Sequence, residues 1–217
     1  MKSTFKNFII SIDGPAGSGK QLISKYIAKK YKFFHLDSGI LYRRLVVQIL
    51  KKNIKLDDLY NLKKFIGLQK KISSRNHSTL RKENISIASS KIAVHEFIRN
   101  YINKQQRIIV LKKLQSFGGC VIDGRDIGSN VFKDAKIKLF IDVKAEIRAK
   151  RRHKQLIALG EKSIYPKILK EIKLRDKLDK NRNHSPLVIP NGAIIINNSN
   201  SFQTTKITIN KILNNLK

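Results

Sequence analysis

The chain has 217 residues, 41% of them hydrophobic, which is enough for one core and too few for two ordinary domains. It carries 46 lysines and arginines against 15 aspartates and glutamates, a formal net charge of +31. A run of about 18 apolar residues, which a membrane span needs, does not occur, and the single cysteine excludes an intramolecular disulfide.

Short apolar runs alternate along the chain with segments of helical spacing. Strands are predicted at 8–12, 33–36, 120–123, 137–141 and 193–196. Helices are predicted at about 22–27, 41–49, 144–159, 165–180 and 204–216, with a mostly helical, polar section at about 53–114. Because short buried strands that alternate with helices form parallel sheets, the predicted fold class is α/β, a five-stranded parallel sheet flanked by helices.

The strongest motif lies between the first predicted strand and the first predicted helix. Residues 14–20, GPAGSGK, fit the pattern G-x-x-x-x-G-K in the context that this pattern requires. Glycines let backbone N–H groups turn towards a phosphate, and the lysine can bridge the outer phosphates. The predicted ATP-binding residues here are Gly14, Pro15, Ala16, Gly17, Ser18, Gly19, Lys20 and Gln21. The alternative is a glycine-rich turn with an exposed lysine.

Gln21 departs from the usual pattern, in which a Ser or Thr that contacts magnesium follows the lysine. Mg²⁺ is expected with ATP. It would be held mainly by phosphates and water, which suits its reluctance to lose bound water. We therefore predict ATP binding without assigning a protein ligand to the metal.

A second polar motif, LDSGILYR at 36–43, follows the second predicted strand, where ligands of open α/β sheets bind. Ser38 and Arg43 are five residues apart and could clamp a second phosphate. Alternatively, Ser38 only caps a helix and Arg43 is a solvated charge.

A third motif, DGRDIG at 123–128, follows the third predicted strand. Asp123 is placed like a Walker-B aspartate, and Arg125 and Asp126 could bind phosphate and base or sugar. The alternative is a polar turn with an internal ion pair.

Two sets of arginines complete the candidate site. Arg148 and Arg152 are four residues apart on one helical face, and Arg175, Asp179 and Arg182 follow the spacing i, i+4, i+7. They could neutralise a phosphoryl group during its transfer, because arginine is always charged and binds phosphate with two donors. The alternative is a solvated face with an Arg175–Asp179 pair that contributes only a few tenths of a kcal/mol.

Together these motifs resemble the bacterial cytidylate kinase family over nearly the whole chain. Residues 123–128 look like its D-G-R-D-[IM]-G motif, and 175–182 look like its R-D-x-x-D-x-x-R motif. The resemblance implies phosphoryl transfer from ATP to CMP or dCMP. It places at the CMP site Ser38, Arg43, Ser90, Arg99, Arg125, Asp126, Arg175, Asp179 and Arg182.

Within that set, the resemblance implies that Ser90 and Arg99 read cytosine. The catalytic residues that it implies are Lys20, Arg125, Arg175, Asp179 and Arg182. Arg148 and Arg152 would lie beside ATP at a lid. His153, also at the lid, is expected to be a solvated helix residue rather than a catalyst.

The resemblance also implies one kinase domain, with a core at about 1–55 and 115–217 and a lid at about 150–170. The monophosphate-binding insert, at about 56–114, looks shorter than is usual in the family. Its strand-rich hairpin is expected to be replaced by the segment 70–77. The adenine-side loop near Asn197 and Asn198 also departs from the family pattern.

The high positive charge could instead indicate a nucleic-acid partner. However, the basic residues are spread along the chain and accompany many Asn and Ile residues, as at 194–198, so AT-rich coding would explain them. We expect a cytoplasmic monomer without a secretory signal, a membrane partner or a nucleic-acid partner. The alternatives are a kinase of UMP, AMP or a shikimate-like acceptor, and a basic RNA-binding protein with a degenerate nucleotide fold.

Overall fold

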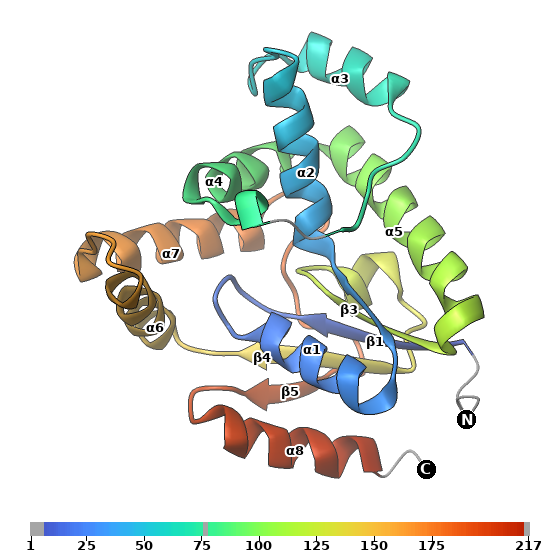
Figure 1. The fold of residues 1–217 in the computed structure, drawn as a ribbon, viewed down its shortest axis with the longest axis vertical. Coiled ribbons are helices and arrows are strands. Elements are labelled where there is room, and N and C mark those ends of the chain that lie inside the picture. Colours follow the sequence, from blue (N-terminus) through green and yellow to red (C-terminus); the bar gives the residue numbers. More distant parts are fainter. Residues whose placement is uncertain (1–6, 76–77, 215–217) are drawn as a thin grey trace.

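The computed structural model describes residues 7–75 and 78–214, which form a parallel sheet with a helical insert beside it (Figure 1). The strands are β1 (Phe8–Asp13), β2 (Phe34–Asp37), β3 (Gly119–Asp123), β4 (Ile137–Asp142) and β5 (Ile194–Asn197). The helices are α1 (Lys20–Tyr31), α2 (Ser38–Lys51), α3 (Leu59–Leu68), α4 (Glu83–Ile92), α5 (Glu96–Phe117), α6 (Ala145–Ala158), α7 (Tyr165–Asn181) and α8 (Phe202–Asn214). Two short turns, η1 (Ser78–Arg81) and the π-helical η2 (Ile127–Val131), complete the elements.

The sheet has the strand order β2-β3-β1-β4-β5, and every neighbouring pair is parallel. This confirms the predicted fold class, and each predicted strand lies within about two residues of an observed one. Strand β1 is central, with β3 on one side and β4 on the other. The order of the strands therefore reverses at β1, and in open α/β sheets ligands bind where this happens, beyond the carboxyl ends of the strands.

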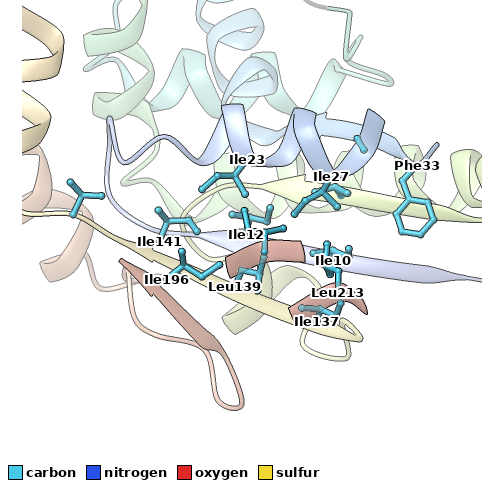
Figure 2. Close-up of a cluster of buried hydrophobic side chains, with 14 residues drawn as sticks. Ile10, Ile12, Ile23, Ile27, Phe33, Ile137, Leu139, Ile141, Ile196 and Leu213 are labelled. Atoms are coloured by element: carbon cyan, nitrogen blue, oxygen red, sulfur yellow. The ribbon is translucent and has the colours of Figure 1, made fainter. Parts of the chain in front are cut away.

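One face of the sheet is covered by α1 and α8 (Figure 2). Ile10 and Ile12 of β1 are at most 1% exposed and pack against Ile23 and Ile27 of α1. Burying one such side chain stabilises the fold by about 1.5–3 kcal/mol. This packing fixes the start of α1, and hence the glycine-rich loop before it, against the centre of the sheet.

The other face of the sheet is covered by the C-terminal half of α5, through Val110 and Leu114. The N-terminal half of the same helix packs in a second cluster with α2 and α4, through Ile98 and Ile102. Because α5 belongs to both clusters, the insert and the sheet share one continuous helix, as Figure 1 shows.

The described residues between α2 and β3 form helices, turns and loops, with no strand among them. This agrees with an insert that lacks a strand-rich hairpin, although His77 and Asn76 of the predicted replacement segment lie outside the described residues. The insert's proposed limits and those of the lid stay predictions. In the described part of the chain, no helix has both the length and the apolar character to cross a bilayer.

Candidate active site

The glycine-rich loop connects β1 to α1 and lies against the end of β4. Gly14, Gly17 and Gly19 have φ values of 145°, 72° and 88°, which side chains rarely adopt. A Cβ on Gly14 would also lie 2.4 Å from the carbonyl oxygen of Ile141. The loop conformation therefore depends on glycine, as the motif predicts.

Lys20 begins α1 and is buried, so the alternative of an exposed lysine is wrong. Its Nζ donates to the carbonyl oxygen of Pro15 over 2.7 Å and to Ser18 Oγ over 3.3 Å. Burial, followed by repulsion from Arg125, lowers the pKa of Lys20 well below its ordinary value. An anion in the loop would stabilise the charged form of this amine.

Two side chains from other elements hold the loop. Asn198 Nδ2 donates to the carbonyl oxygen of Ser18 over 2.7 Å, which gives the altered loop after β5 a defined structural role. Arg148 of α6 is 4% exposed and donates to the carbonyl oxygens of Ala16, over 3.0 Å, and Val143, over 2.9 Å.

Arg148 and Arg152 both lie on α6 but bind different partners. Arg148 forms an ion pair with Asp176 of α7, with Nη1 3.0 Å from Oδ1. Arg152 instead reaches the insert, where its Nη2 lies 2.7 Å from Glu83 Oε2 at the start of α4. Arg148 thus supports the glycine-rich loop, whereas Arg152 is partly exposed between α6 and α4.

His153 is half-buried, and its Nδ1 lies 2.8 Å from Ser163 Oγ. The expectation of a solvated residue is therefore only partly met. Its contact lies within the proposed lid rather than with the glycine-rich loop.

A cluster of ion pairs joins three arginines and two aspartates from three parts of the chain. Arg99 Nη2 lies 2.5 Å from Asp126 Oδ2, and both side chains are at most 6% exposed. Arg125 Nε lies 2.9 Å from Asp179 Oδ2. Arg182 reaches both carboxylates, at 3.4 Å from Asp179 and 3.9 Å from Asp126. We call these residues, together with Arg175, the arginine cluster.

The ion-pair partners of Asp179 differ from the partner that the sequence spacing suggested. Among the ion pairs of the described residues, its partners are Arg125 and Arg182, while Arg175 Nη1 donates to Ser86 Oγ of α4 over 3.2 Å. The alternative of a surface ion pair between Arg175 and Asp179 is therefore wrong. Helix α7 ends at Asn181, so Arg182 lies at its C-cap rather than on the helical face proper.

Positive charge is in excess in the arginine cluster. Burial, followed by repulsion from Arg125, lowers the pKa of Arg175 to about 10. Burial and then Arg99 also lower the pKa of Arg182. Burial acts to raise the pKa of Asp179, but Arg125, Arg182 and Arg175 outweigh it and hold the pKa below its ordinary value. The site is therefore suited to a bound anion.

The second motif lies beside this cluster at the start of α2. The helix begins at Ser38 with Asp37 as its N-cap, so Ser38 is not the capping residue. A Cβ on Gly124 would lie 3.0 Å from Ser38 Oγ, which places Ser38 against the DGRDIG loop. Arg43 Nη1 lies 3.8 Å from Asp37 Oδ2.

Ser90 and Arg99, the proposed cytosine-reading pair, make separate contacts. Ser90 Oγ donates to the carbonyl oxygen of Ser86 over 3.2 Å within α4. Arg99 Nη1 donates to the carbonyl oxygen of Ala93 over 3.2 Å, in addition to its pair with Asp126. Their joint role in base reading stays a prediction.

Sequence reasoning missed several residues that the fold brings to the site. Tyr42 is buried, and its ring centroid lies 5.9 Å from Arg99 Cζ. Its place between Ser38 and Arg43 was an available signal. His35 Nε2 lies 2.5 Å from Asp123 Oδ1, so this Walker-B-like aspartate has a partner from β2. Asp13, Ser86 and Asp176 were also missed.

A polar cavity of about 480 Å³ adjoins the arginine cluster through Arg99. Its lining comes from α5 and from segments around Asn130 and His184. It contains no residue of the glycine-rich loop, so this cavity is not the ATP site.

A glycine-rich phosphate loop on a parallel sheet, close to a partly buried cluster of arginines, defines a phosphotransferase of the P-loop class. Likeness to solved structures supports the fold: TT1252 from Thermus thermophilus has a TM-score of 0.52 at 13% identity, covering 98% of this chain and 99% of that one. A family model described as cytidylate kinase matches residues 10–217.

Named relatives agree with that match. A cytidylate kinase from Rickettsia africae (strain ESF-5) is 40% identical over 194 residues, or 89% of this chain and 85% of the relative. One from Fusobacterium nucleatum is 36% identical and covers 96% of this chain and 94% of its own length. The chain belongs to the cytidylate kinase family and is a kinase.

Proposed function

We propose that this kinase transfers the γ-phosphoryl group of ATP to CMP or dCMP, giving ADP and CDP or dCDP. The observation that carries the proposal is the excess of positive charge in the arginine cluster, where Asp126 and Asp179 face Arg99, Arg125, Arg175 and Arg182. Such a charge imbalance is costly in a buried site unless an anionic substrate relieves it.

The donor nucleotide binds at the glycine-rich loop. Its backbone N–H groups and the start of α1 provide a positive potential for the phosphates. Lys20 lies within this loop and supplies a cation to the outer phosphates. Arg148 keeps the loop in place through the carbonyl oxygen of Ala16 rather than by touching ATP from an exposed position.

The acceptor binds at the arginine cluster and at the start of α2. Ser38, Arg43, Arg125, Arg175 and Arg182 bind its phosphate and neighbouring groups. The sugar and base are bound by Ser90, Arg99, Asp126 and Asp179. The support for these roles is the family resemblance, together with the position of Ser38 beside Gly124 and the link between Arg99 and Asp126.

The carboxylates at the ends of β2 and β3 fit a magnesium ion that arrives with ATP. Asp37 and Asp123 are register partners there, and Lys20 is close enough for Asp123 to act on its pKa. Mg²⁺ usually binds through one or two carboxylates, phosphates and waters, so these aspartates would hold it. When bound, it would neutralise charge on the β- and γ-phosphates.

Catalysis by this chain consists mainly of positioning and charge stabilisation, because both substrates are anions and the acceptor is a phosphate oxygen. Lys20 and the arginines neutralise the group in transfer, and a strong general base is not needed. The lid formed by the C-terminal part of α6 and the start of α7 excludes water, which limits hydrolysis of ATP.

The test is a coupled assay of ADP release, with CMP, dCMP, UMP, AMP and GMP each offered as acceptor. We expect CMP and dCMP to give the highest kcat/KM. A preference for AMP would overturn the cytidylate assignment and leave the kinase class intact, whereas no ADP release with any acceptor would overturn both. Monomeric state and cytoplasmic location stay predictions, which sedimentation and cell fractionation would check.

A further inference from the structure

Asp13 is the last residue of β1 and directly precedes the glycine-rich loop. Its side chain is fully buried and accepts two backbone hydrogen bonds from a distant part of the chain. Ile127 N donates to Oδ1 over 2.8 Å, and Gly128 N donates to Oδ2 over 2.7 Å. Both donors belong to the DGRDIG loop that carries Arg125 and Asp126.

The same loop is pressed closely against β1. A Cβ on Gly128 would lie 2.6 Å from Ser11 Oγ and 3.3 Å from Asp13 Oδ2. Gly124 N also donates to the carbonyl oxygen of Ile12 over 3.0 Å. Both ends of the loop are therefore attached to the strand that leads into the ATP site.

A buried carboxylate accepts these two hydrogen bonds at a cost in stability, because it is removed from water. Burial raises the pKa of Asp13 to about 6, although the bonds from Gly128 and Ile127 act to lower it. The charged groups that act on it are Asp126, which raises the pKa, and Lys20, which lowers it. A buried charge that costs stability is retained where function requires its geometry.

We infer that Asp13 is a positioning residue that sets Arg125 and Asp126 relative to the glycine-rich loop, and so aligns the acceptor with the donor. An ionised Asp13 has two acceptor oxygens that match two N–H donors. A protonated carboxyl or an amide turns a donor towards one of those N–H groups and releases that end of the loop. The inference rests on the proposed function for its choice of acceptor.

The test compares Asp13→Asn with Ser11→Ala, a change two residues earlier on the same face of β1. Because a misplacement of about 1 Å can cost about 10²-fold in rate, we expect Asp13→Asn to lower kcat/KM for CMP at least about 10-fold. The KM for ATP should change by no more than about twofold, since the glycine-rich loop is unaltered. Hydrogen exchange at the amides of Ile127 and Gly128 should become faster, and Ser11→Ala should match the wild type.

The pH profile gives a reading that a purely structural role would not. Because the folded pKa of Asp13 is about 6, the wild type and Ser11→Ala should lose kcat/KM for CMP as the pH falls through 6. Asp13→Asn should have a shallower acid limb, which reflects only protonation of the CMP phosphate, a monoester with a second pKa of about 6. The contribution of Asp13 to the free energy of unfolding changes in the opposite direction. Its raised pKa favours the folded state at low pH, so a loss of activity there would not reflect unfolding.

A second variant keeps the inference testable if Asp13→Asn does not fold. Gly128→Ala pushes Gly128 N away from Asp13 and should reproduce the loss in kcat/KM for CMP. The double variant Ser11→Ala/Gly128→Ala removes the 2.6 Å contact but keeps those of 3.2 Å with Pro190 Cγ and 3.3 Å with Asp13 Oδ2, so it should recover part of the activity.

A folded Asp13→Asn within about twofold of the wild type, or Gly128→Ala with unchanged kinetics, would overturn the inference. If the wild type does not phosphorylate CMP, the proposed function is overturned instead. The two failures are therefore distinguishable.

Discussion

Gln21 Nε2 donates to Asp37 Oδ2 over 2.9 Å, so the first turn of α1 is joined directly to the end of β2. Gln21, which departs from the usual phosphate-loop pattern, thus contacts the LDSGILYR motif at 36–43, where we propose that the acceptor binds. Its amide group bridges the two halves of the site, in a position where a hydroxyl would usually face a metal ion.

We predict that Gln21→Ala lowers the free energy of unfolding by about 1.5–3 kcal/mol, which is typical for loss of a hydrogen bond to a charged group. The concentration of Mg²⁺ needed for half-maximal activity should change little, because Asp37 still has Arg43 beside it when the amide is lost. Urea unfolding and a Mg²⁺ titration would measure both, with Leu22→Ala as the exposed control on the same turn. A marked rise in the Mg²⁺ requirement would contradict this and show that Gln21 either binds the metal or orients Asp37 towards it.

Lys20→Ala should abolish phosphoryl transfer and leave the fold intact. The lowered pKa of Lys20 means that its charged form is disfavoured in the folded state, so removing the charge does not weaken folding. Lys20→Met removes the charge with less loss of volume and should also be inactive. Turnover and urea unfolding would be compared with Lys25→Ala on the exposed side of α1. Turnover near that of the wild type would contradict the assignment of the ATP site.

Arg175→Ala and Arg182→Ala should each lower kcat and kcat/KM on the order of 10²-fold, as expected when a contact to developing charge is lost. Neither should lower the melting temperature greatly, because each removal relieves repulsion among the partly buried arginines. Lys177→Ala, exposed on the same helix, is the control. Unchanged turnover in both arginine variants would leave the arginine cluster without a catalytic role.

The contrast between Arg148 and Arg152 on α6 predicts different defects. Arg148→Ala leaves Asp176 without its partner and frees two carbonyl oxygens, so it should cost about 3 kcal/mol of stability. Arg152→Ala breaks a partly exposed pair with Glu83 and should cost less than about 1 kcal/mol. Chemical unfolding of both variants would measure this difference. Equal stability losses would show that the burial of Arg148 does not increase its contribution to the free energy of unfolding.

Much of this architecture could be predicted because it is encoded over short stretches. The five strands follow from short apolar runs, and the glycine-rich loop follows from glycines at positions with positive φ between a strand and a helix. Backbone conformation of this kind depends on neighbouring residues only. The chemical types at the site, a lysine in a glycine-rich loop and arginines at strand ends, were therefore visible in the sequence.

The partners of those residues were not visible, because ion pairs form between segments that are distant in the chain. Helical spacing favoured an ion pair between Arg175 and Asp179, yet Asp179 pairs with Arg125, which is 54 residues away in the chain. Spacing likewise put Arg148 and Arg152 on one face, but α7 and the insert provide them with different carboxylates.

Asp13 shows the same division most clearly. In the sequence it only ends an apolar run, and its role depends on two N–H groups more than 110 residues further along the chain. The sequence by itself determined the sheet, the phosphate loop and the charged residue types. Only the tertiary structure decided which charges are buried together, because desolvation and pairing depend on packing between distant segments.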